Sequence, residues 1–154
     1  MTITKLANDT YAMTDRERQN LKLTIDYSKI NYLPEIWSIL AAKCGSVVAL
    51  NSPHSKPPIS LTYQEVATQI QLFATGLQNL GVQPHSGGAL FADNSPRWLI
   101  ADQGIMLSGA FNAVRSSQAD TQELLSILAN SQAKVLVIED IKTLKKLSDK
   151  LVDL

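Results

Sequence analysis

The chain has 154 residues, of which 45% are hydrophobic and 18% are charged, and its 14 Lys and Arg residues balance 14 Asp and Glu residues. This length and composition indicate a globular protein and exclude a fibrous or wholly disordered chain, while zero net charge argues against a strongly basic nucleic-acid-binding protein. The single cysteine, Cys44, excludes an internal disulfide and favours a reducing compartment.

The first 31 residues are polar and weakly patterned, so we expect an N-terminal arm over residues 1–31. Thr14 and Glu17 have the spacing of a capping box, which leaves a short helix there as the alternative. The start lacks the sustained apolar run of a secretory signal peptide, and no run reaches the roughly 18–20 residues that span a bilayer. We therefore expect a cytoplasmic protein, with peripheral contact to a membrane left open.

The next segment predicts one helix and two short extended stretches. A helix over about 34–44 follows from Pro34 and Glu35 in its first turn and from Gly45 at its end. A strand over 47–50, a loop over 51–58 and an extended stretch over 59–61 come next.

The strongest helical pattern begins after Thr62. Thr62 and Glu65 form a capping box, and Gly81 closes the helix. Steps of three and four along the sequence place the apolar residues on one stripe, which we expect to be buried. These residues are Tyr63, Val66, Ala67, Ile70, Phe73, Ala74, Leu77 and Leu80.

A strand–helix–strand unit follows. A buried strand is predicted over 87–92, and Ser95 as N-cap with Pro96 at the first position predicts a helix to about residue 107. A further strand is expected over 111–114.

The last part repeats the alternation. Asp120 and Glu123 have capping-box spacing before a helix, and the unbroken apolar run of the strand over 134–139 predicts cover on both of its faces. A final helix begins near Asp140, with Ile141, Leu144, Leu147 and Leu151 on one side. Strands and helices in alternation indicate an α/β fold with a parallel sheet covered by helices.

Candidate chemistry gathers where strands end, because ligands of parallel α/β sheets bind at the carboxyl ends of the strands. Asp93 and Arg97 follow one predicted strand, and Arg115 follows another. The alternative is structural: helix capping around Ser95, and a turn with a surface arginine.

Other motifs carry little chemistry. Cys44, His54 and His85 stand apart in sequence, so packing and solvent exposure explain them better than a metal or nucleophile. Gly76 and Gly104 each have a glycine five residues on, but neither pair is followed by the Lys of a phosphate loop. The lysines of the final helix have Asp140, Asp149 and Asp153 beside them and suit a solvated face better than a lipid or carrier contact.

Three stretches carry a more specific pattern: 61–66 with 74–82, then 93–98 with 101–102 and 109–110, then 130–140. In this order they resemble the opening of the AMP-forming adenylating enzymes, which include acyl-CoA synthetases, luciferases and peptide-synthetase adenylation domains. Residues 89–104 and 112–119 are similar to long-chain acyl-ACP/acyl-CoA synthetases of cyanobacterial or plastid type.

The resemblance implies a two-step reaction in the full-length family. A fatty acid carboxylate attacks the α-phosphate of ATP, with Mg²⁺ present, to give acyl-AMP and pyrophosphate. A phosphopantetheine thiol of acyl carrier protein or CoA then displaces AMP.

The family's phosphate loop, adenine-binding segment, ribose-binding aspartate and catalytic lysine all lie downstream of the residues present here. We therefore expect residues 32–154 to form part of the large N-terminal adenylating-enzyme domain, truncated, with no catalytic, cofactor-binding or metal-binding residue in this chain. Such a chain is expected to be inactive alone. One alternative is a non-catalytic module that binds a separate remainder of the enzyme, an acyl chain or a carrier, or that associates with itself through an exposed sheet edge. The other alternative is a functionless truncation product.

One local departure from the family pattern lies at residues 85–88. Ser86 and Gly88 replace the aspartate and valine of the family's Gly-Asp-x-Val sequence. A glycine inside a strand costs on the order of 0.5–1 kcal/mol, and we expect a packing gap at Gly88.

Overall fold

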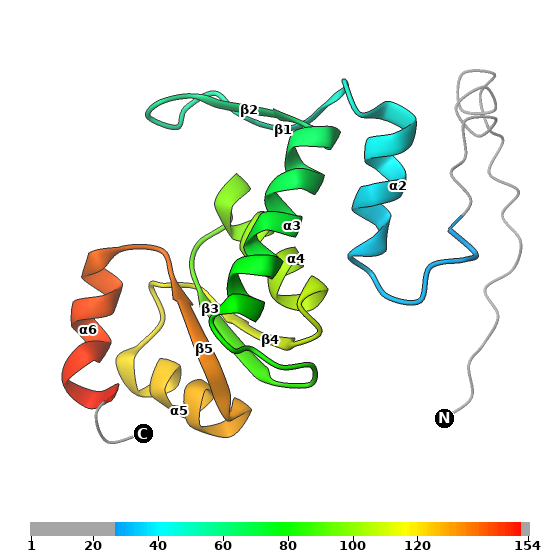
Figure 1. Ribbon diagram of the computed structural model, residues 1–154. Helices are drawn as coiled ribbons and strands as arrows, with labels where there is room; N and C mark the ends of the chain where they lie inside the picture. The colour runs from blue at the N-terminus through cyan, green and yellow to red at the C-terminus, as the bar shows by residue number, and fades with distance from the viewer. Residues whose placement is uncertain (1–26, 152–154) are drawn as a thin grey trace, which may run out of the picture.

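The computed structural model describes residues 27–151. Three parallel strands form the main sheet in the order β4 (Phe111–Arg115), β3 (Gly87–Phe91), β5 (Ala133–Ile138) (Figure 1). The strand over 87–92 and the strand over 111–114 are thereby confirmed. Most of the expected arm, and the alternative helix at Thr14, lie outside the described residues.

Helices cover both faces of this sheet. Helices α3 (Tyr63–Asn79) and α4 (Pro96–Leu107) pack on one face, where Leu90 of β3 meets Leu77 and Ile105. Helices α5 (Thr121–Ser131) and α6 (Ile141–Leu151) pack on the other face, against Ala89 and Phe91. Successive residues of a strand point to opposite faces, so β3 supplies both cores and the α/β prediction is confirmed.

Helix α3 forms as the capping pattern predicts. The Thr62 hydroxyl accepts from the Glu65 backbone N–H, and the Glu65 carboxylate accepts from the Thr62 backbone N–H. Gly81 follows at φ +90°, a conformation that favours glycine. Leu80 is the exception on the apolar stripe, because it lies past the helix end and is 80% exposed.

The first two strands are a separate hairpin. Strands β1 (Val48–Ser52) and β2 (Ile59–Thr62) pair antiparallel with each other, and the hairpin contacts α3 and α4. Strand β1 runs to Ser52, two residues into the predicted loop. Helix α2 (Glu35–Cys44) ends before Gly45 as predicted and packs on α3 (Figure 1).

The predicted capping box at α5 is wrong. Asp120 caps the helix by accepting from the Gln122 backbone N–H at 2.8 Å. The Glu123 carboxylate instead pairs with the Arg115 Nε at 2.6 Å, because Arg115 ends β4 beside the start of α5. The Glu123 carboxylate therefore bonds to the Arg115 guanidinium and not to the backbone N–H of Asp120 at the start of α5.

The predicted cover on both faces of β5 is present but incomplete, because Val135 and Val137 pack into one core and Leu136 and Ile138 into the other. The residues of β5 are half-buried or exposed, whereas every residue of β3 is buried. The reason is the position of β5 at the edge of the sheet. Helices pack against it on both faces, but no strand lies beyond it within the described residues. In α6 likewise, Leu147 is buried, while Ile141 is 66% exposed.

The packing gap expected at Gly88 does not exist. A Cβ there would come 2.8 Å from Ile105 Cγ2, and one at Gly87 would come 2.5 Å from the Ser131 carbonyl oxygen. Neighbouring elements close onto the glycines, so β3 needs small residues at these positions.

Candidate functional site

The carboxyl ends of the three parallel strands meet at one edge, as the sequence predicts. Asp93 follows β3 and Ser116 follows β4, and the Ser116 hydroxyl donates to Asp93 Oδ1 at 2.5 Å. The same hydroxyl accepts from the Gln118 backbone N–H at 3.1 Å. Asp93 is therefore engaged in holding the β4 loop beside the β3 loop.

Glu139, which follows β5, is the residue that our sequence reasoning missed. Its Oε2 accepts from the Asp93 backbone N–H at 3.0 Å and from the Ser117 hydroxyl at 2.9 Å. Its own backbone N–H donates to the Phe91 carbonyl. One carboxylate thus ties the ends of all three strands. It is the last residue of the predicted strand over 134–139, and a carboxylate at the carboxyl end of a strand was the signal that could have found it.

Arg115 and Arg97 have different surroundings. Arg115 is held against α5 by Glu123, and hydrogen bonding and charge from Glu123 raise the pKa of the Arg115 guanidinium. Arg97 is exposed in the first turn of α4 and lines a pocket on the α3 and α4 face of the sheet.

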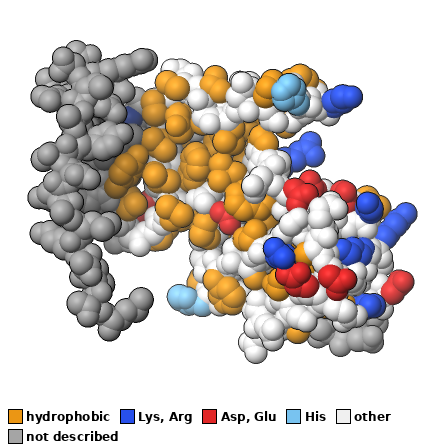
Figure 2. Space-filling view, turned by 180° about the vertical axis from the view of Figure 1, so that it is seen from behind, with side chains coloured by type: hydrophobic (Ala, Val, Ile, Leu, Met, Phe, Trp, Pro, Cys, Tyr) orange, Lys and Arg blue, Asp and Glu red, His pale blue; other side chains and the backbone are white. Residues whose placement is uncertain are grey.

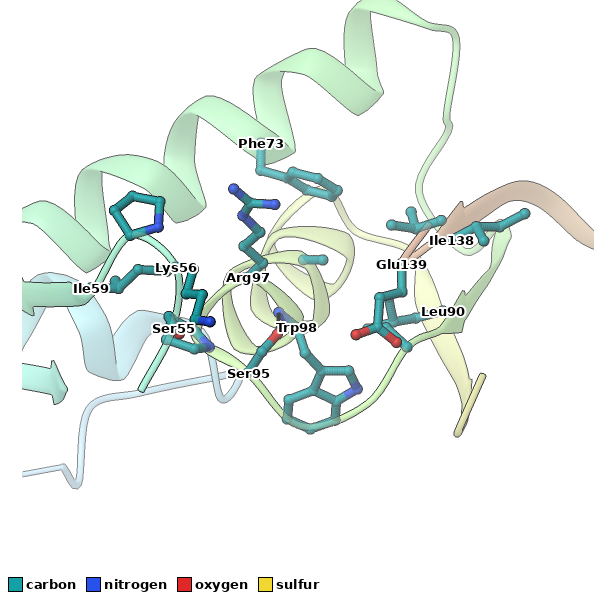
Figure 3. A pocket seen from close by; sticks show the side chains of 15 residues that line it. Ser55, Lys56, Ile59, Phe73, Leu90, Ser95, Arg97, Trp98, Ile138 and Glu139 are labelled. Carbon is teal, nitrogen blue, oxygen red and sulfur yellow. Dashed lines mark hydrogen bonds between the residues drawn. The ribbon is translucent and has the colours of Figure 1, made fainter. Parts of the chain in front are cut away.

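That pocket has a volume of about 430 Å³. Its walls are mainly apolar and come from α3, α4, β3, β5 and the hairpin loop, with Phe73, Trp98 and Val137 among them. Figure 3 shows Arg97 and Lys56 on one side of the pocket and Glu139 on the opposite side. The chemistry on offer is an apolar surface with charges at its rim.

Neither Cys44 nor the two histidines line this pocket, and no hydrogen bond within the described residues joins them to Asp93 or Glu139. Cys44 ends α2, where its thiol donates to the Leu40 carbonyl oxygen. His54 is exposed in the hairpin loop, and His85 is exposed before β3 at φ 66°. The packing and exposure explanations fit these three residues.

Residues 40–153 match the family model described as AMP-binding enzyme. The chain belongs to this family. The match covers helices on both sides of the sheet together with the hairpin, so the family assignment applies to the whole described fold apart from its first residues.

Similar proteins of this family include fatty acid ligases from a plant and from a frog. The chain is 46% identical over 108 residues to the chloroplastic long-chain-fatty-acid–[acyl-carrier-protein] ligase AEE15 of Arabidopsis thaliana. It is 27% identical over 146 residues to a long-chain-fatty-acid–CoA ligase, ACSBG2, of Xenopus laevis. The first match covers 70% of this chain but 15% of the plant protein. The second covers 91% of this chain and 20% of the frog protein.

Solved structures show the same fold. The N-terminal domain of FACL13 from Mycobacterium tuberculosis superposes with a TM-score of 0.70 at 18% identity, covering 76% of this chain and 29% of that one. The N-terminal subdomain of NpsA from Klebsiella oxytoca gives 0.65 at 23% identity, covering 73% and 28%. The α/β fold is therefore that of part of the N-terminal domain of adenylating enzymes.

Family membership implies ATP and Mg²⁺ for the full-length enzymes, so we tested whether these residues fit such groups. Residues 27–151 contain no group of three or more His, Cys, Asp or Glu side chains placed so that they could hold a metal ion. The space beside Gly104 is filled by Phe73, and Gly76 lies inside α3. The carboxylates of Asp93 and Glu139 already accept hydrogen bonds from serines. The described residues do not fit a nucleotide or its metal, and the absence of catalytic residues stays a prediction.

Within residues 27–151, no helix has both the length and the apolarity needed to cross a membrane.

Proposed function

We propose that this chain supplies the first part of the large domain of a long-chain fatty acid–ACP or fatty acid–CoA ligase. The observation that carries the proposal is the 46% identity with the plant long-chain-fatty-acid–ACP ligase. In the proposed enzyme, ATP and Mg²⁺ activate a fatty acid as acyl-AMP, and a thiol of acyl carrier protein or CoA receives the acyl group. A cytoplasmic location with peripheral membrane contact is part of the same proposal.

The surface supports membership of a larger unit. Figure 2 shows hydrophobic side chains gathered across the middle of the back face, while charged side chains concentrate on the lower right part. Contiguous apolar surface of this kind marks a region that another element or chain covers. The exposed large hydrophobic residues are Tyr27, Tyr32, Leu33, Val47, Val48, Leu72, Leu80, Phe111, Val114, Ile141 and Leu144.

We propose further that the chain alone does not catalyse adenylation. Its 154 residues contain no Ser/Thr/Gly-rich loop ending in Lys to hold a triphosphate. The role proposed for the described residues is structural: the strand ends are held in register by Asp93 and Glu139, and the sheet is covered on both faces.

The test is fatty-acid-dependent ATP–pyrophosphate exchange with palmitate as substrate. The purified chain is expected to give background exchange. A mixture with the remaining part of the plant ligase, made as a separate polypeptide, is expected to give exchange that depends on both pieces. Exchange by the chain alone contradicts its proposed inactivity, and no exchange by an assembled mixture contradicts the ligase proposal.

A second candidate function is that of a non-catalytic assembly module. It is favoured by β5, a sheet strand that is only half-buried. In that case the chain binds a complementary polypeptide without conferring ligase activity, and the exchange assay separates the two candidates.

A further inference from the structure

Strand β5 presents an unpaired backbone edge. The Glu139 N–H donates to the Phe91 carbonyl oxygen, so Glu139 faces β3. Alternate residues of a parallel strand bond to opposite neighbours, and therefore the N–H and C=O groups of Leu136 and Ile138 point away from β3. No strand pairs with this side of β5 within the described part of the chain.

The position of α6 indicates where a following strand belongs. The connection from β4 through α5 to β5 crosses over β3, with α5 on one face of the sheet. Helix α6 packs on that same face. Crossovers between parallel strands are right-handed in about 98% of cases, so two successive crossovers on one face proceed in the same direction. A parallel strand that follows α6 therefore lies outside β5, and not outside β4.

Two hollows flank this edge, one on each face of the sheet. The pocket of about 430 Å³ lies on the α3 and α4 face, where Val137 and Phe73 line it. A groove of about 580 Å³ lies on the α5 and α6 face, between Ala129, the backbone of β5 and Leu151. An added strand places alternate side chains on the two faces, so its side chains can fill both hollows.

We propose that the free edge of β5 is the docking site for a parallel β-strand with alternating apolar residues, from the remaining part of the adenylating domain. This inference rests on the proposed function. The occupant is argued from the length of the relatives, since the matched segment is 15% of the plant ligase and 28% of the NpsA N-terminal subdomain chain. A sheet edge that is half-buried and hollowed on both faces is completed by another strand.

The test uses the full chain with the rest of the Arabidopsis ligase AEE15, made as a separate polypeptide starting after its matched segment. Hydrogen exchange is followed by mass spectrometry on peptides from each sheet edge. We expect the backbone amides of Leu136 and Ile138 to exchange hydrogen about tenfold more slowly in the mixture than in the chain alone. Asn112 and Val114 face outward on β4 and serve as the internal comparison, with no change expected.

Two variants of α5 sharpen the result. Ala129→Lys puts a cation into the groove beside β5, and Asn130→Lys adds the same charge one residue away, outside the groove. Both positions are exposed, so both variants are expected to fold. We expect A129K to weaken binding of the plant polypeptide about tenfold and N130K to leave it nearly unchanged.

The outcomes separate this proposal from the function. Slower exchange in β5 together with loss of binding in A129K supports the docking site, whether or not the mixture shows ligase activity. No binding, or protection at β4 with none at β5, overturns it. ATP–pyrophosphate exchange without protection of the β5 amides retains the proposed function and rejects β5 as the docking edge. Protection of the β5 amides without ATP–pyrophosphate exchange supports the docking edge and contradicts the proposed function.

Discussion

The ring of Phe73 on α3 lies directly against Gly104 on α4. A Cβ at residue 104 would come 2.7 Å from Phe73 Cδ1 and 3.1 Å from Phe73 Cβ. This contact explains why a glycine stands inside α4, and it leaves no room there for a phosphate group. The two helices make the most extensive contact between any pair of described elements, so the glycine sets how closely they approach.

Gly104→Ala is therefore expected to destabilise the chain by about 1–3 kcal/mol, because the added methyl group must push the helices apart. Gly76→Ala in α3 is the matched control, since nothing lies within 4 Å of a Cβ built there. That variant is expected to gain about 0.5–1 kcal/mol from helix propensity. Urea unfolding of both variants measures the difference, and equal effects of the two substitutions contradict the packing argument.

Glu139→Ala is expected to loosen the strand ends. The change removes the acceptor used by the Asp93 backbone N–H and by the Ser117 hydroxyl. Because the site is exposed and water replaces part of the loss, we expect a cost of about 1 kcal/mol in urea unfolding. Ser117→Ala removes one of the two bonds and should cost less. A larger loss in S117A than in E139A counts against Glu139 as the common tie.

The capping box of α3 predicts a dependence of stability on pH. The Thr62 backbone N–H, and then its hydroxyl, donate to Glu65 and hold the pKa of that carboxyl below its ordinary value of 4.5. A pKa depressed by folding means that the stabilisation is complete above pH 4.5 and is lost as the pH falls through the lower folded-state pKa. Glu65→Gln keeps an acceptor without the charge, so its unfolding free energy should fall less with acidification. Identical pH profiles for the two proteins disprove the link.

Trp37 joins α2 to the rest of the fold through a polar contact. Its Nε1 donates to Gln103 Oε1 at 2.9 Å, and Gln103 is 6% exposed. A double-mutant cycle with Trp37→Phe and Gln103→Leu should give a coupling energy of about 1 kcal/mol, because each single change leaves the other group without this partner. Additive effects of the two changes show that the contact does not stabilise the docking of α2.

Helix caps and helix-ending glycines predicted the bounds of the helices well, because these signals act between residues that are close in sequence. The Thr62 cap, the Ser95 cap before Pro96, and the glycines after α3 and α4 act within one turn of a helix. The sheet edge that carries Asp93 also followed from the order of the elements. These features can be predicted without knowing which strands are neighbours.

The errors concern contacts between different elements of the fold. The apolar run of β5 is typical of a strand covered on both faces, yet strand order places it at an edge. Glu123 has capping spacing, but Arg115 reaches it from another element. The role of Glu139 likewise depends on Ser117, which arrives from β4. None of these partners can be identified from spacing within one segment.

The order of the strands also determines how long β3 stays uncovered during synthesis. Strand β3 is central, but it is made before both of its neighbours, and the face that carries Phe91 is covered by residues as late as Leu147. Ribosomes add about 5–20 residues per second, so the roughly 56 residues between these two positions take about 3–11 s. For that interval β3, the one described strand whose residues are all buried in the folded chain, has one face uncovered. Nascent chains on the same polysome can then contact one another through this exposed apolar segment. A chaperone that binds the segment has seconds, not milliseconds, in which to act.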